Sequence, residues 1–222
     1  MVVYKYTEIS HRHMKMTQKT DLKIAENISD LPDLISDSDG VITDLSSTYH
    51  EYMLEVHGHK AVVNEPSFFS FKDAYPNLEK PHQYIPDFVN DPYWFAKISV
   101  YPDAKIALQK LHQAGKKITI VTSCGDSKET MRARLECYER ELGNIVSDVI
   151  FQPLAKCKSD TLSGMPKSVF FDDLESVCNE VSAHGHDVYM RQRNYNINVC
   201  PLRDFGGNFK IAKSWSDLPY FD

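Results

Sequence analysis

The stretch Leu34-Ile35-Ser36-Asp37-Ser38-Asp39-Gly40 joins a short apolar run to two aspartates that lie two residues apart. An apolar run that leads into Asp and Gly is typical of a buried strand ending in a turn. In an open α/β sheet, ligands bind at the carboxyl ends of the strands, so we expect both carboxylates at a binding site. One carboxylate could act as a nucleophile and hold a cation, while the other moves a proton.

A calcium loop and a helix cap are two alternatives to a catalytic role for this stretch. An EF-hand calcium loop needs Gly at its sixth position and Glu at its twelfth. Counted from Asp37, these positions hold Ile42 and Thr48, so a calcium loop does not fit. An Asp-rich turn that caps a helix remains an alternative when the stretch is considered alone.

Five further runs of apolar and β-branched residues predict strands along the chain. They cover residues 117–121, 146–151, 168–171, 187–190 and 211–215. Helical patterns lie between them, and strands that alternate with helices predict a parallel sheet covered on both faces. The expected fold class is therefore α/β, with a Rossmann-like three-layer core.

Two of the intervening helices show clear boundaries. The first can open at Pro102 and stop at Gly115, and the second stops at Gly143. The expected inner face of the first helix consists of Ala104, Ala107, Leu108 and Leu111. Helical spacing predicts that the second helix turns inward Met131, Leu135, Tyr138 and Leu142.

Residues 45–98 interrupt the alternation of strands and helices, with five prolines and eleven Phe, Tyr or Trp side chains. About 50 residues is too long for an ordinary loop between a strand and a helix. We therefore expect a small, mainly helical cap domain at 45–98, inserted into a core of residues 31–44 and 99–222. Residues 1–30 form an N-terminal extension with a short strand expected at 2–6. In the extension, His11 and His13 fit a solvated tail better than a metal site.

Composition limits the class of protein. The 222 residues are 42% hydrophobic and 25% charged, as in ordinary globular proteins, and the net charge is −6. The acidic balance argues against a nucleic-acid-coating protein, and no run approaches the roughly 20 apolar residues of a membrane helix. Five cysteines without a CxxC motif, after a start that lacks an apolar signal region, predict a reduced, cytoplasmic protein.

Three more polar groups follow expected strands. Thr122-Ser123 could bind an anion or simply cap a helix, and Asp172-Asp173 could hold Mg²⁺ or cap a helix. Lys156 and Lys158 lie between the third and fourth strands, where one ammonium could neutralise a phosphate. Each group has an ordinary structural role open to it, but all of them together at successive strand ends favour a catalytic site.

This order of motifs resembles the phosphatases of the haloacid dehalogenase superfamily, over roughly residues 33–218. Further features resemble its 5'(3')-deoxyribonucleotidases: the pair Thr122-Ser123 and the segments 91–95, 101–104, 191–196 and 214–218. The longer gap from Lys158 to Asp172 leaves Lys156 as an alternative for the motif lysine. At the position of Leu45, the deoxyribonucleotidases often have an aromatic residue that packs on the nucleobase.

The resemblance implies Mg²⁺-dependent hydrolysis of nucleoside monophosphates through an aspartyl-phosphate. Asp37 would be the nucleophile and Asp39 the general acid and base, with Thr122, Ser123 and Lys158 binding the phosphoryl group. Mg²⁺ would contact Asp37, the backbone carbonyl of Asp39, Asp173 and, more remotely, Asp172. In the cap, Trp94 and Phe95 could flank the base, or they could be cap core.

Other functions remain as alternatives. They are a phosphatase of the same superfamily for sugar or small organic phosphates, and a non-catalytic binding module with the same fold. The acidic balance disfavours a phosphatase or kinase that acts on nucleic-acid ends. The sequence also lacks the usual motifs of zinc hydrolases and of serine hydrolases. The expected partner is a small phosphomonoester, without nucleic acid or membrane, and the resemblance also allows a homodimer.

Overall fold

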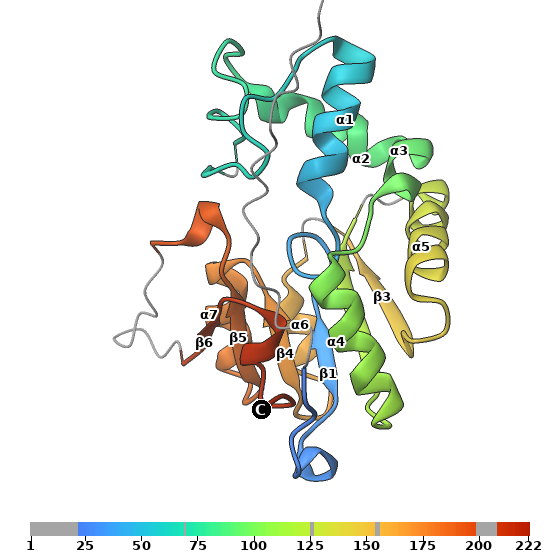
Figure 1. Cartoon of the computed structure of the whole chain (residues 1–222), viewed down its shortest axis with the longest axis vertical. Helices are drawn as coiled ribbons and strands as arrows, with labels where there is room; N and C mark the ends of the chain where they lie inside the picture. The colour runs from blue at the N-terminus through green and yellow to red at the C-terminus, as the bar shows by residue number, and fades with distance from the viewer. Residues whose placement is uncertain (1–21, 69, 125–126, 154–155, 199–207) are drawn as a thin grey trace, which may run out of the picture.

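A six-stranded parallel sheet forms the centre of the molecule, in the order β3-β2-β1-β4-β5-β6 (Figure 1). The computed structural model describes residues 22–68, 70–124, 127–153, 156–198 and 208–222. The strands are β1 (Leu34–Ser36), β2 (Ile118–Ser123), β3 (Asp148–Gln152), β4 (Val169–Asp172), β5 (Asp187–Arg191) and β6 (Lys210–Ala212). The expected α/β, three-layer parallel fold is confirmed.

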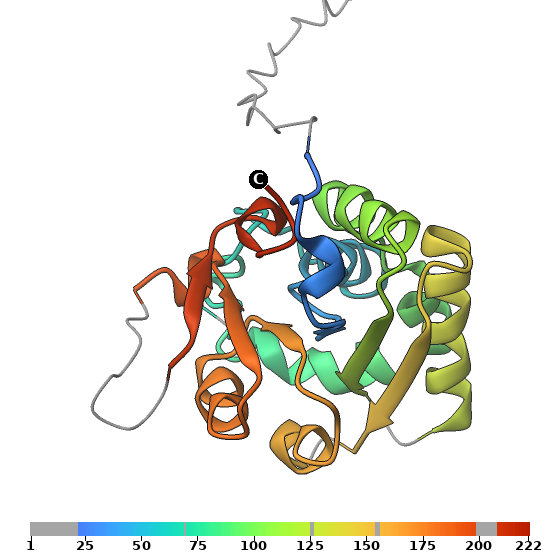
Figure 2. The same cartoon turned by 90° about the horizontal axis from the view of Figure 1, so that it is seen from below.

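Helices cover both faces of this sheet, as Figure 2 shows from below. They are α4 (Pro102–Gln113) and α5 (Lys128–Leu142) on one side, and α6 (Lys158–Leu162) and α7 (Glu175–Ser182) on the other. Side chains of a strand alternate between the two faces. In β1, Leu34 joins the hydrophobic cluster of α4 and α5, whereas Ile35 joins that of α6 and α7.

Two local expectations were wrong. The sixth strand was expected at 211–215, but it ends at Ala212, and Trp215 begins the short 3-10 helix η5 (Trp215–Asp217). In α5, Leu135 is 45% exposed, because the buried face is rotated from the expected one. The residues that α5 buries are Thr130, Ala133, Arg134, Cys137, Tyr138 and Leu142.

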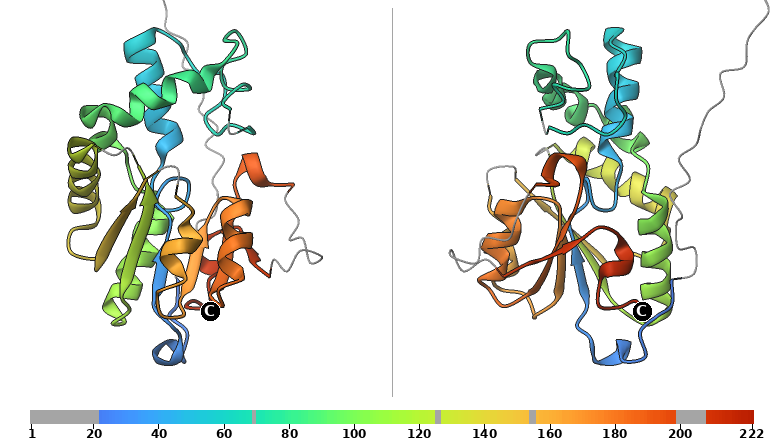
Figure 3. Two further views of the ribbon diagram at one scale, coloured as in Figure 1. Left: turned by 180° about the vertical axis from the view of Figure 1, so that it is seen from behind. Right: turned by 60° about the vertical axis from the view of Figure 1, so that its left-hand side comes forward.

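A helical cap stands beyond the carboxyl ends of the strands, as the two views of Figure 3 show. It contains α1 (Leu45–His57), the 3-10 helix η2 (Pro81–Tyr84), α2 (Ile85–Asn90) and α3 (Pro92–Lys97). Aromatic rings fill its centre: Tyr49 lies 4.7 Å from Phe71 and 5.4 Å from Phe88, between ring centroids. Ring pairs at such separations add to the stabilisation from burial. Most of the expected aromatic cluster is therefore cap core.

The first and last described segments meet at the opposite side of the core from the cap (Figure 1). Ile24 forms an antiparallel bridge with Phe221, and Leu22 is buried, so the end of the expected N-terminal extension packs on the core. The expected strand at 2–6, His11, His13 and Cys200 lie outside the described residues. The described cysteines form no disulfide with one another. None of the helices in the described part of the chain is long and apolar enough to cross a bilayer.

Candidate functional site

The loop after β1 turns sharply at Gly40. Gly40 has φ +80°, a conformation that side chains rarely adopt, and a Cβ atom there would lie 2.9 Å from Cγ of Asp173. The turn also depends on Ser38, whose carbonyl accepts hydrogen bonds from the backbone of Ile42 and Thr43, both at 2.8 Å. Glycine at this position therefore lets the Asp37 loop pass directly over the aspartates that follow β4.

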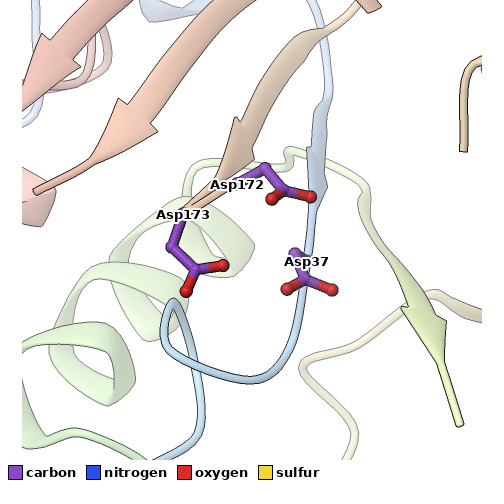
Figure 4. A group of neighbouring side chains, drawn as sticks. All are labelled: Asp37, Asp172 and Asp173. Carbon is purple, nitrogen blue, oxygen red and sulfur yellow. The ribbon is translucent and has the colours of Figure 1, made fainter. Parts of the chain in front are cut away.

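Three buried carboxylates converge at this point (Figure 4). Asp37 follows β1, while Asp172 and Asp173 come from the end of the neighbouring strand β4. One oxygen of each carboxylate lies within 4.8 Å of the others, close enough to share a metal ion. The parallel pairing of β1 with β4 brings together the aspartates that were expected at the site from the sequence.

Lys158 is the cation within this cluster. Its Nζ lies 2.6 Å from Oδ1 of Asp37 and 2.7 Å from Oδ2 of Asp172. Burial disfavours the charged form of Lys158, but Asp172 and Asp37 outweigh burial and raise its pKa above the ordinary value. Lys156 is exposed and lies on the wall of the adjoining cavity instead. The geometry therefore favours Lys158 over Lys156 as the lysine of the site.

The cluster carries more negative charge than Lys158 can balance. The pKa of Asp37 is raised to about 7, mainly by burial; Lys158 lowers it, and the charges of Asp172 and Asp39 add to the rise. Burial also raises the pKa of Asp173, with Asp172 and Asp37 adding to the shift. Three carboxylates and one ammonium leave a formal charge of −2, and carboxylate oxygens are ligands that Mg²⁺ prefers. The residues present thus fit a divalent cation.

Asp39 points to a different partner, Arg134 of α5. Two nitrogen–oxygen contacts of 2.8 Å join Nη2 of Arg134 to both carboxylate oxygens of Asp39. Thr43 donates a further hydrogen bond of 2.7 Å from Oγ1 to Oδ1 of Asp39. The Arg134 side chain is fully buried and lies 3.9 Å from the ring centroid of Phe95. Arg134, which stacks on Phe95 of the cap, thereby fixes the position of the Asp39 carboxylate, the group expected to transfer protons.

The end of β2 brings one hydroxyl of the expected pair to the cavity. Ser123 lies on the cavity wall with Asp37, Asp39 and Lys158. Thr122 is 1% exposed and is not among the residues that line this cavity. Neighbouring residues of a strand point to opposite faces, which is why the two hydroxyls separate. Ser123 is therefore the better placed of the two to contact a ligand.

A cavity of about 460 Å³ connects the aspartates to the cap. Its cap wall is largely apolar and is formed by Leu45, Pro66, Phe71, Ile85 and Val89. Its core wall carries the charged groups already described, together with Tyr195 and Glu180. A ligand there would place a charged group on the core side and an apolar group on the cap side.

Trp94 and Phe95 do not line this cavity. They are 4% and 1% exposed, and α3 packs them against α1 and α5. The Trp94 ring lies 5.6 Å from that of Tyr52, and Phe95 stacks on Arg134. The structure thus places both in the base of the cap, and other cap residues face the ligand space.

The structure adds residues that were not expected at the site from the sequence. Arg134 is one, and Tyr195 is another, since its hydroxyl donates a hydrogen bond to Oδ2 of Asp173. Asn196 donates from Nδ2 to the carbonyl of Asp173 at 2.8 Å. The segment 191–196 was singled out only for its resemblance, while the helical pattern of α5 gave no indication that an arginine would be buried.

Comparisons with known proteins agree with this architecture. The chain resembles a dehalogenase crystallised as an intermediate complex, with 16% identity, a TM-score of 0.54, and coverage of 84% of this chain and 95% of that one. It also resembles CbbY from Rhodobacter sphaeroides in complex with phosphate, with 12% identity, a TM-score of 0.53, and coverage of 85% and 96%. The fold is the haloacid dehalogenase-like α/β fold. No family model matches the sequence, and no curated protein matches it significantly.

A third similar structure with this haloacid dehalogenase-like fold is described as a phosphoglycolate phosphatase, from Lactobacillus delbrueckii subsp. bulgaricus. It is 16% identical, with a TM-score of 0.54 and coverage of 83% of this chain and 95% of that one. Likenesses at these identities establish the fold. The activity of this chain depends on its own residues.

Proposed function

We propose that the chain is a Mg²⁺-dependent phosphomonoesterase that acts on nucleoside monophosphates through an aspartyl-phosphate on Asp37. The observation that carries this proposal is the cluster of Asp37, Asp172 and Asp173 with Lys158, set in the floor of a cavity with an apolar cap wall. Similar structures that include a phosphate complex support phosphate as the charged group.

In the proposed reaction, an oxygen of Asp37 attacks phosphorus and the bond from phosphorus to the ester oxygen breaks. Asp39 gives a proton to the leaving oxygen and later takes one from the water that cleaves the acyl-phosphate. Lys158 and Ser123 hold phosphoryl oxygens while charge moves between them. The products are a nucleoside and inorganic phosphate.

Mg²⁺ fits the carboxylate cluster described above. Asp37, Asp173 and the backbone carbonyl of Asp39 would hold it, with Asp172 more remote. Bound there, Mg²⁺ would offset the repulsion between an anionic nucleophile and an anionic substrate. Asp172 has a separate task, because it accepts hydrogen bonds from Lys158 at 2.7 Å and from the Leu174 backbone at 2.9 Å, and so keeps the ammonium in place.

The second acid separates phosphate chemistry from dehalogenation. A halide leaves without a proton, so dehalogenation needs no general acid to protonate its leaving group. Here Asp39 is fixed two residues after Asp37, and a pair of aspartates stands opposite. Both features serve an anionic substrate whose leaving oxygen must be protonated.

The cap wall argues for a nucleoside as the leaving group. Leu45, Ile85 and Val89 offer apolar surface to a planar base and few hydrogen-bonding groups to a sugar. The first experiment is phosphate release from ribo- and deoxynucleoside monophosphates, 5' and 3', beside sugar phosphates and p-nitrophenyl phosphate, with Mg²⁺ or EDTA. We expect Mg²⁺-dependent release that favours nucleotides and is absent in Asp37→Asn.

Other outcomes of this panel have definite meanings. Release from sugar or aryl phosphates alone would keep Asp37 chemistry and reject the nucleotidase assignment. Phosphate release that EDTA does not reduce would reject the proposed dependence on Mg²⁺. Release from none of the substrates would leave a non-catalytic binding module as the better interpretation.

Lys158 and Lys156 provide a matched pair for the phosphate-binding lysine. Because Lys158 contacts two catalytic-site carboxylates, Lys158→Met should lower kcat/KM by about 10²-fold or more, the scale of losing one charged transition-state contact. Lys156→Met should lower it far less. Circular dichroism of both variants checks folding, and the reverse order of activities would move the role to Lys156.

Leu45 and Leu54, which both belong to α1, provide a variant and a control that test whether the apolar cap wall contacts the nucleobase. Leu45 lines the cavity, whereas Leu54 on the same helix is 49% exposed. Leu45→Asn should raise KM for nucleotides about tenfold, as losing roughly 1.4 kcal/mol of contact would, but change p-nitrophenyl phosphate little. Leu54→Asn should alter neither, and equal effects of Leu45→Asn on both substrates would reject contact with the base.

A further inference from the structure

A second cavity, of about 450 Å³, lies on the core and shares no lining residue with the first. Its walls come from the end of β5, the start of α4 and the turn between β6 and η5. The proposed phosphatase reaction uses none of these residues. Its chemical character is set by two arginines, Arg191 and Arg193.

Arg191 is buried beside this cavity with part of its guanidinium unpaired. It is 5% exposed, and Nη2 forms an ion pair of 2.6 Å with Asp103. Nε and Nη1 are buried and have no hydrogen-bond acceptor among the described residues. A buried donor without an acceptor is unfavourable, and more so when the group is charged, so such a group calls for a ligand.

Arg193 repeats this arrangement on the neighbouring wall. Its Nε donates a hydrogen bond of 2.6 Å to the carbonyl of Gly40, and its guanidinium lies 3.9 Å from the Tyr101 ring centroid. Its Nη1 is 3.8 Å from the carboxylate of Glu65, which is half exposed. Its Nη2 is buried and lacks an acceptor in the described structure. Both arginines thus line one cavity, and three of their guanidinium nitrogens are buried without an acceptor among the described residues.

The charges around the cavity favour an anion. Lys213 adds a third cation to the two arginines, while Asp103 and Glu65 are the only acidic residues among the described residues that line it. Burial lowers the pKa of Arg191, and the nearby charge of Arg193 lowers it further, against the effect of Asp103. An added anion would relieve this repulsion. Ser214 and Ser216 on the same wall are hydrogen-bonded to each other, oxygen to oxygen at 2.6 Å, which leaves one hydroxyl hydrogen of the pair to donate to the anion's oxygens.

We propose that this cavity binds phosphate, either free or as the phosphate group of a small metabolite, through the spare guanidinium donors of Arg191 and Arg193. Planar guanidinium forks match the spacing of phosphate oxygens, which is why arginine predominates where phosphate is bound in a fixed orientation. Trp215 and Ile106 give the cavity an apolar side that suits the remainder of such a metabolite.

The test observes Arg191 directly, by the NMR signal of its Nε–Hε group, assigned with Arg191→Met in the full-length protein. The protein is titrated with inorganic phosphate and, separately, with glycerol 3-phosphate. EDTA is present in both titrations to stop Mg²⁺-dependent turnover. We expect the Arg191 signal to shift and saturate with phosphate, and not with chloride at equal ionic strength. Tighter binding of glycerol 3-phosphate would identify a phosphorylated metabolite as the ligand, and tighter binding of inorganic phosphate the free ion.

Two lysines supply a variant and its control that leave the buried arginines intact. Lys213→Gln should weaken the affinity for phosphate in this titration about two- to fivefold, the scale of one exposed charge contact. Lys210→Gln removes an equal charge from β6 outside the cavity and should leave the titration unchanged. A linear shift, an equal shift with chloride, or no shift of Arg191 would overturn the proposal. The readout is independent of phosphatase activity, so failure of either proposal would be recognised separately.

Discussion

At the scale of single residues, Arg134 contributes most to how the site is held. It contacts both oxygens of Asp39 at 2.8 Å and stacks on Phe95 at 3.9 Å, so it ties the proposed proton-transferring group to the base of the cap. A side chain buried to this degree is costly unless its charge is paired, and Asp39 supplies the pairing. We interpret Arg134 as a positioning residue for Asp39.

Replacing Arg134 should affect substrates according to their leaving groups. A nucleoside oxygen must be protonated as it leaves, whereas p-nitrophenolate leaves without a proton. Arg134→Met should therefore lower kcat/KM for a nucleoside monophosphate by about 10²-fold, the low end of general acid catalysis, and far less for p-nitrophenyl phosphate. Arg134→Lys, which keeps the charge, should recover part of the loss. An equal loss on both substrates would indicate general structural damage instead.

The residues of the site differ in how far the sequence could indicate them. Asp37, Asp39 and the pair Asp172-Asp173 follow apolar runs, and parallel pairing brings such strand ends together. Arg134 could not be found in this way, because arginine is seldom buried and its partner is 95 residues away. Lys156 and Lys158 were separable only by burial, which depends on the packing of α6.

At the scale of elements, Asp44 connects the core to the first cap helix. It caps α1 by accepting a hydrogen bond of 3.0 Å from the Ser47 backbone, and it accepts another of 3.3 Å from the hydroxyl of Tyr101. A side chain that caps a helix satisfies a backbone donor that the helix itself cannot. Helix α1 therefore begins at a defined residue, one position after Asp44.

Removing the helix cap that Asp44 provides should destabilise the protein measurably. Asp44→Ala should lower the free energy of unfolding by about 1 kcal/mol, within the 0.5–2 kcal/mol found for helix caps. Asp44→Asn keeps an oxygen acceptor and should therefore retain most of the wild-type free energy of unfolding. Urea unfolding followed by circular dichroism measures both variants, and equal losses for the two would show that the cap is not the cause.

Elements were predicted where local chemistry decides them. Pro102 at the start of α4 and Gly143 after α5 mark boundaries that backbone geometry requires. The end of β6 was misplaced because Trp215 is apolar enough to continue a strand, yet it is fully buried at the start of a 3-10 helix. Such a choice depends on contacts with Phe171, which no local pattern contains.

At the scale of the whole molecule, stability should depend on pH through His50 in the cap. Nδ1 of His50 lies 2.7 Å from the Tyr75 hydroxyl, and Nε2 lies 3.0 Å from the carbonyl of Asn64. Burial lowers the pKa of His50, although the Asn64 hydrogen bond and the charges of Asp44 and Asp73 partly oppose this. The folded protein therefore takes up a proton on His50 less readily than the unfolded chain.

The sign of the effect follows from this difference. Below about pH 6.5, the ordinary histidine pKa, the unfolded chain binds more protons at this position, so acidification favours unfolding. The stability contributed by His50 should be complete above that pH and fall as the pH decreases through it. Urea midpoints from pH 7.5 to 5.5 should thus decline less steeply in His50→Gln than in the wild type. Parallel declines would exclude His50 as the source.

The interruption of the alternating pattern predicts an insert at 45–98, but it does not predict how the helices of this segment pack. Which aromatic residues fill the cap and which reach the cavity depends on how α1, α2 and α3 pack together. Trp94 is buried in this packing and Phe71 reaches the cavity, although both are aromatic residues in the same insert.

The positions of the two tryptophans in the chain have a spectroscopic consequence. Trp94 is buried in the cap, and Trp215 is fully buried in the core, 5.0 Å from the Phe171 ring centroid. Each part of the molecule therefore carries its own intrinsic fluorophore. Trp94→Phe would leave tryptophan emission that reports the core alone, and Trp215→Phe would leave tryptophan emission that reports the cap alone. The loosening of one part can thus be recorded optically while the other part stays intact.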